Sequence, residues 1–146
     1  MKNLTLVVLI AVAAVPSISR AGVYTDDMTK CLVESTSKDD RLTLVRWMFA
    51  AMSQHPAVAS LTTVSDGDIE KANASVGALF MKLLTKTCVE ATRKAVRYEG
   101  AFAIQASFQA LGQVATMDLF ADPNVLKVMS GLEKHADPEK LAELSK

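Results

Sequence analysis

The sequence has few of the residues and none of the motifs that mark the familiar enzyme classes. It contains 2 cysteines, 6 glycines and only 2 histidines, His55 and His135, which form no metal-ligand spacing. No HExxH, GxSxG, glycine-rich phosphate loop or haem CxxCH motif is present. Basic and acidic residues balance at 16 each, which gives no reason to expect a nucleic-acid partner. We therefore expect no metal, no cofactor and no motif-borne catalytic site, although catalytic groups that converge from distant positions stay open.

The longest apolar run lies at the start of the chain and is typical of a secretory signal peptide. Lys2 precedes an apolar segment, 4–15, that is broken only by Thr5, and Ser19 and Ala21 then supply the small residues read by a signal peptidase. The run is too short for an ordinary membrane span. The first 21 residues are therefore expected to be cleaved. The remainder is expected to be a single exported domain, periplasmic or extracellular, without a membrane span.

Cys31 and Cys88 are the only cysteines, and an exported protein meets an oxidising compartment. An intramolecular disulfide between them is favoured, and closing so long a loop could stabilise the fold by up to about 4 kcal/mol. A buried free thiol and an intermolecular bridge are the alternatives. Because no CxxC spacing is present, redox catalysis has no support.

Helix signals dominate residues 22–146, and strand signals are nearly absent, so we predict an all-α, single-domain bundle of about five to seven helices with one disulfide. Helix starts are indicated by capping residues and by two Asp-Pro pairs. The first expected helix is 26–35, capped by Thr25, and the second is 39–54, which Ser37 opens and Pro56 ends. A helix of about 30 residues follows from Ser65–Asp68 to the break at Gly100, and it can contain a kink. The last three are 101–121, a helix that Asp122-Pro123 begins and that fades near His135, and 139–144 after Asp137-Pro138.

Two of these helices are apolar around most of their circumference. Trp47, Phe49 and Met52 belong to the 39–54 helix, and the 101–121 helix carries no charge before Asp118. Either both helices are central, or an apolar face is completed by another chain or a ligand. The pattern thus allows a homodimer, a partner protein or an apolar ligand.

Three glutamines of the uncharged helix, Gln105, Gln109 and Gln113, recur every four residues and form a narrow polar strip. The strip either faces solvent or lines a cavity or interface, where amides can hydrogen-bond a partner without a charge penalty. Our candidate interaction surface consists of these three glutamines together with Trp47, Phe49 and Met52.

A candidate basic face lies on the long helix. Lys82, Lys86, Arg93 and Arg97 fall within about 60° of each other on an uninterrupted helix. Such a stripe is either a solvated face, tied by pairs such as Lys86–Glu90, or a site for an anionic partner such as lipid headgroups or an acidic protein.

The run Cys31-Leu-Val, continued by Leu44-Val-Arg-Trp-Met-Phe and His55-Pro, resembles a group of small exported proteobacterial helical proteins with the same spaced pattern. The resemblance covers mainly residues 31–58. It implies a periplasmic helical protein and carries over no catalytic residue.

These observations leave three hypotheses. The favoured one is an exported binding or interaction module that uses the apolar 39–54 helix or the glutamine-bearing helix. The alternative is an acid- or stress-activated periplasmic chaperone, similar in outline to small helical chaperones with one disulfide, in which carboxylate protonation loosens the fold and exposes apolar surface. The third is an enzyme with a dispersed site, in which a pocket would gather His55 with several carboxylates.

Overall fold

The computed structural model describes residues 22–144, so the expected signal peptide lies outside the described part of the chain. Every regular element between these bounds is a helix, and Cys31 is bonded to Cys88. This confirms the all-α fold with one disulfide. The elements are α1 (Val23–Glu34), α2 (Lys38–Met52), α3 (Asp66–Lys82), the π-helical turn η1 (Leu83–Thr87), α4 (Val89–Glu99), α5 (Phe102–Phe120), α6 (Pro123–Ser130), the 3₁₀ turn η2 (Gly131–His135) and α7 (Pro138–Glu143).

Local capping sets most of the helix starts. The Ser37 hydroxyl accepts the Asp40 N–H at 3.1 Å and the Asp40 carboxylate accepts the Ser37 N–H at 3.0 Å, which completes a capping box. Ser65 and Asp68 repeat this arrangement at α3. Asp122 caps α6, with proline at the first helical position as expected.

The start of α1 differs from the expectation. Thr25 does not cap a helix that begins at residue 26, because α1 already begins at Val23 and Thr25 is buried within it. The N-cap residue Gly22 has no side chain to offer. Instead, the Glu99 carboxylate at the end of α4 accepts the Tyr24 N–H at 2.9 Å and the Thr25 N–H at 2.8 Å. A residue far along the chain therefore supplies the cap.

The expected long helix is broken where the disulfide attaches. After α3, the Cys88 N–H donates to the Leu83 carbonyl, five residues back, at 2.8 Å, which closes the π-helical turn. Cys88 then starts α4, and the disulfide ties it to Cys31 on α1 with 5.9 Å between the Cα atoms. Gly100, with φ of +83°, ends α4 as the sequence predicts.

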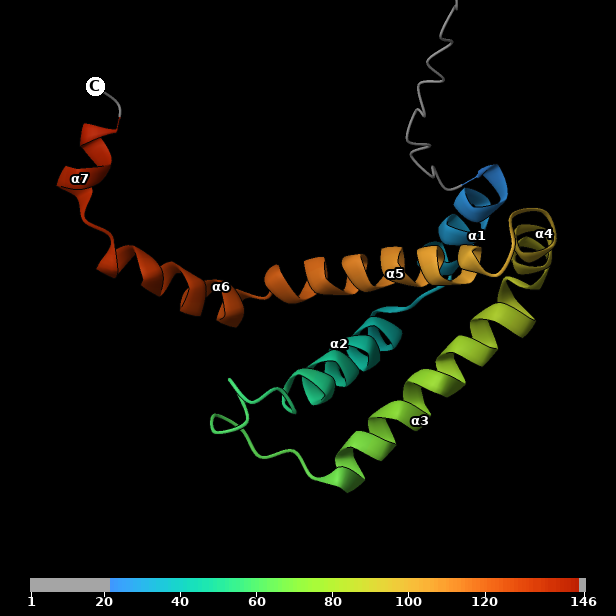
Figure 1. The fold of residues 1–146 in the computed structure, drawn as a ribbon, viewed down its shortest axis with the longest axis horizontal. Helices are drawn as coiled ribbons and strands as arrows, with labels where there is room; N and C mark the ends of the chain where they lie inside the picture. The colour runs from blue at the N-terminus through green and yellow to red at the C-terminus, as the bar shows by residue number, and fades with distance from the viewer. Residues whose placement is uncertain (1–21, 145–146) are drawn as a thin grey trace, which may run out of the picture.

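Two groups of helices share one core (Figure 1). α1 packs against α4 and α5, while α2 packs against α3 and the other side of α5. Alanines and a serine at the buried positions of α4 and α5 allow close approach to α1. The buried core consists of Met28, Leu32, Leu44, Val76, Leu79, Leu83, Cys88, Ala95, Ala103, Leu111 and Ala115, with Ser107 buried beside it.

The C-terminal segment stands apart from this core. α6, η2 and α7 extend beyond the end of α5 (Figure 1), and none of them has a buried residue. Among the described helices, none is long and apolar enough to cross a membrane.

Candidate interaction groove

An apolar groove of about 670 Å³ lies between the second half of α2 and the last turns of α5. Phe49 and Met52 are 52% and 56% exposed in it, although both are large apolar side chains. An uncovered apolar depression of this kind is typical of a binding surface. The lining residues are Val45, Arg46, Trp47, Met48, Phe49, Ala51, Met52, Thr116, Leu119 and Phe120.

The helix period of α2 explains why these side chains remain uncovered. Leu44 is buried against the core, whereas Phe49, five positions later, lies on another side of the cylinder and faces solvent. The wide apolar surface of α2 therefore supplies a core face and a groove face at once. The groove face of α2 is therefore the apolar face that another chain or a ligand can cover.

Trp47 lines the groove and is hydrogen-bonded to α3. Its indole N–H donates to the Asn73 side-chain oxygen on α3 at 3.0 Å. Trp47 and Met48 also line a second hollow of about 470 Å³ beside the groove, together with Gln105 and Gln109 of α5. The structure therefore brings Trp47 and two of the three glutamines together.

Gln113 is exposed on α5 and lines neither of these two hollows. All three glutamines are exposed. Ser107, which also belongs to the uncharged helix, is fully buried and accepts a hydrogen bond from the Thr29 hydroxyl at 2.9 Å. The polar strip therefore consists of the glutamines alone, and its first two members border the groove region.

Sequence reasoning missed the α5 wall of the groove. Thr116, Leu119 and Phe120 form it, and Met117 beside them is 70% exposed. The usable signal was the apolar cluster on either side of Asp118 at the end of an uncharged helix. Placing that cluster against α2 requires the crossing of the two helices, which the sequence pattern does not contain.

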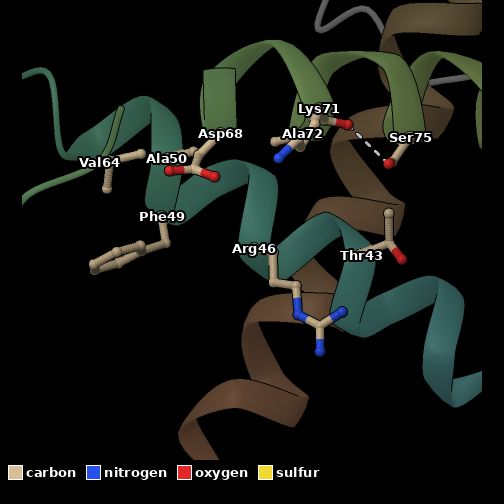
Figure 2. A pocket seen from close by; sticks show the side chains of 9 residues that line it. All are labelled: Thr43, Arg46, Phe49, Ala50, Val64, Asp68, Lys71, Ala72 and Ser75. Carbon is tan, nitrogen blue, oxygen red and sulfur yellow. Dashed lines mark hydrogen bonds between the residues drawn. The ribbon is translucent and has the colours of Figure 1, made fainter. Parts of the chain in front are cut away.

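A smaller hollow of about 330 Å³ lies between α2 and α3. Figure 2 shows Arg46 and Phe49 leaving α2 on the side away from α3, whereas Asp68 extends from α3 towards α2. The Thr43 hydroxyl donates to the Asp39 carbonyl at 3.0 Å, so it is engaged within its own helix. The Ser75 hydroxyl likewise donates to the Lys71 carbonyl of its own helix, at 2.8 Å (Figure 2). Neither hydroxyl that lines this hollow is therefore paired with a base, as nucleophilic catalysis requires.

Capping interactions govern the carboxylates near these hollows. Hydrogen bonds from Ser65, first through its hydroxyl, hold the pKa of Asp68 below its usual value. The Ser37 hydroxyl and N–H, with Lys82 and Arg41 nearby, do the same for the pKa of Asp40. These groups are therefore ionised structural caps and not proton donors near neutral pH.

Two arginines of α2, Arg41 in its first half and Arg46 near its middle, have different surroundings. Arg41 is bound to Asp118 of α5, with 2.5 Å between Nε and Oδ2. Arg46, at the groove, makes no ion pair within residues 22–144, and so its charge is available to a partner.

The expected basic face is divided by the break before α4. Lys82 belongs to α3 and lies 3.9 Å from Asp40, whereas Arg93 and Arg97 belong to α4. Arg93, not Lys86, pairs with Glu90, at 2.5 Å. The expected alignment of these cations holds only for one uninterrupted helix, whereas the π-helical turn separates Lys82 from Arg93 and Arg97.

Neither histidine lines any of the hollows described above. The His55 Nδ1 accepts the Ala57 N–H at 3.2 Å in the turn after α2, so the imidazole stabilises this turn. Across residues 22–144, no cluster of three or more His, Cys, Asp or Glu side chains could hold a metal ion.

Comparison with known protein families, with curated proteins and with solved structures finds no match to this chain. The groove is thus the feature from which a function can be argued.

Proposed function

We propose that the protein is an exported interaction module whose apolar groove binds the apolar face of a partner helix. The single observation that carries this proposal is the exposure of Phe49 and Met52 in a groove walled by two packed helices. A groove between helices is the usual receptor for an amphipathic helix. Arg46 at its edge supplies a charge that can select among partners.

The proposal includes export. The signal-like start of the sequence and the Cys31–Cys88 bond both fit an oxidising compartment. Mass spectrometry of the protein recovered from such a compartment tests this part. We expect a mass that begins at Gly22 and lacks two hydrogens. An intact N-terminus would contradict the export proposal.

The only tryptophan, Trp47, makes groove occupancy measurable. Titration of dilute protein with the dye 1-anilinonaphthalene-8-sulfonate should transfer Trp47 emission to bound dye. Met52→Asp should weaken this binding at least tenfold, since it places a charge in the apolar groove. Met81→Asp is the matched control, because Met81 on α3 is exposed to a similar extent but lies outside the groove. Equal effects of the two variants would refute the groove as the binding site.

One observation favours acid-activated chaperone function as a second candidate. The Glu99 carboxylate ties α4 to α1, and hydrogen bonds, led by the Thr25 hydroxyl, hold its pKa below the ordinary value. Protonation in acid would release this tie and loosen α1. Suppression of client aggregation at acid pH, but not at neutral pH, would support this candidate.

A further inference from the structure

The C-terminal segment 123–135, here named the arm, carries an apolar stripe that is largely exposed in the described part of the chain. Val125, Val128, Met129 and Leu132 follow the spacing i, i+3, i+4, i+7, which places them on one face of α6 and its continuation η2. Val128 and Leu132 are 78% and 75% exposed. A helix with such a stripe is stable when the stripe is buried against another surface.

The arm continues beyond the end of α5 and contributes no residue to the lining of its own chain's groove. The Asp122 N–H donates to the Leu119 carbonyl at 3.2 Å, and the Asp122 carboxylate accepts the Asn124 N–H at 2.8 Å. These bonds hold the start of α6 at the end of α5, and α6 extends beyond α5 without lying over α2 (Figure 1). Leu119 also forms part of the groove wall, so the arm starts where the groove ends.

We infer that the arm of a second copy of this chain occupies the groove, and that the first copy's arm returns the contact. The inference rests on the proposed function, because it names the partner helix for that groove. One chain carries both an exposed apolar groove and an amphipathic helix with an exposed apolar stripe. A two-fold exchange covers both on each copy and closes the assembly as a dimer.

Charge complementarity agrees with this occupant. Arg46 at the groove has no ion-pair partner in the described chain, and Glu133 follows directly after Leu132 at the end of the arm's stripe. Glu133 is the one acidic side chain of the arm, which also carries Lys127 and Lys134, so its pairing with Arg46 requires the docking orientation that brings the end of the stripe to Arg46. Such a pair fixes the register of the docked helix more than it adds affinity.

The test is analytical ultracentrifugation of the full mature chain and of three variants over a concentration series. We expect a reversible dimer for the wild type. Met129→Asp on the arm and Met52→Asp in the groove should each raise the dimer dissociation constant at least tenfold. Ser130→Asp is the matched control on the polar side of the arm and should leave the constant unchanged within about twofold.

Mixing the two defective variants gives the sharpest result. Met129→Asp retains an intact groove, and Met52→Asp retains an intact arm. Their mixture should therefore form a heterodimer through one intact contact, with a lower dissociation constant than either variant shows alone. Failure of the mixture to associate would overturn the inference. A dimer that forms as readily in each of the two single variants as in the wild type would overturn it as well.

The dye experiment separates this inference from the proposed function. A wild-type protein that stays monomeric while its groove still binds dye overturns the second-copy occupant and leaves the groove's function standing. A groove that binds no dye in the Met129→Asp variant, where the arm cannot cover it, refutes the proposed function itself. Stronger dye binding by Met129→Asp than by concentrated wild type supports both.

Discussion

The Glu99 carboxylate holds Thr25 by two hydrogen bonds, one from its backbone N–H at 2.8 Å and one from its hydroxyl at 2.6 Å. α1 is thus anchored by the last residue of α4. Because the anchor is an ionised carboxylate, the attachment depends on pH.

The first prediction concerns acid stability. The folded-state pKa of Glu99 lies below its ordinary value of 4.5, so its ionised form stabilises the fold. This contribution is complete above the ordinary pKa and is lost as the pH falls through the folded value. Glu99→Gln should therefore be less stable than wild type at pH 7, and the difference should shrink in acid.

Urea unfolding over a pH series measures this change. Glu139→Gln on the exposed α7 is the control and should follow the wild-type curve. A constant gap between Glu99→Gln and wild type at every pH would contradict an ionisation-dependent anchor. Asp40 and Asp68, whose pKa values are also lowered, should leave some acid sensitivity in the variant.

A second prediction uses two glycines. A Cβ at Gly22 would lie 2.2 Å from a Glu99 carboxylate oxygen, although the Gly22 φ of −77° suits any residue. Gly22→Ala should therefore displace the carboxylate and destabilise the fold. A Cβ at Gly77, inside α3, meets nothing within 4 Å, so Gly77→Ala should stabilise by about 0.5–1 kcal/mol. Thermal unfolding of both variants checks these opposite signs.

The third prediction concerns the disulfide. Replacing both Cys31 and Cys88 by serine should lower the free energy of unfolding by about 2–5 kcal/mol. Denaturant titration with and without reductant provides the measurement. Reductant should shift the wild-type curve towards that of the variant and leave the variant's curve in place. Identical wild-type curves in both conditions would show that the bond contributes nothing to stability.

The fourth prediction separates the two sides of α5. Leu111 is fully buried, and Leu111→Ala should cost about 3–5 kcal/mol of unfolding free energy through the cavity it leaves. Gln113, two residues later, is exposed, and Gln113→Ala should change stability by less than about 0.5 kcal/mol. Comparable losses for the two variants in urea unfolding would mean that the glutamine strip is packed.

Local chemistry made much of this fold predictable. Three capping side chains, those of Ser37, Ser65 and Asp122, accept hydrogen bonds from N–H groups within a few residues. Their role as caps could therefore be inferred from the nearby sequence alone. The cap of α1 could not be inferred in this way, because Glu99 lies 74 residues from Thr25. The sequence pattern also allowed a kink in the long helix, but the π-helical turn that divides the basic residues was not foreseen.

The groove was predictable only on one side. The sequence shows that α2 is apolar around most of its circumference and nominates Phe49 and Met52 for an interaction surface, but its period does not tell which face meets the core. The opposite wall, Leu119 and Phe120, depends on where α5 crosses α2, which is a property of the packed fold. The stripe on α6 was visible in the sequence as four apolar residues at helical spacing, yet its exposure became clear only once the end of α5 was placed.

The contact between Gly22 and Glu99 gives the expected signal cleavage a structural meaning. The Gly22 N–H also faces the Glu99 carboxylate. Cleavage after Ala21 would convert this amide into a free ammonium group beside that carboxylate. A positive charge at a helix N-terminus is ordinarily unfavourable, but here it would be neutralised by the side chain that caps the helix. Maturation would thus do more than release the protein, since it would add a charge pair that only the processed chain possesses.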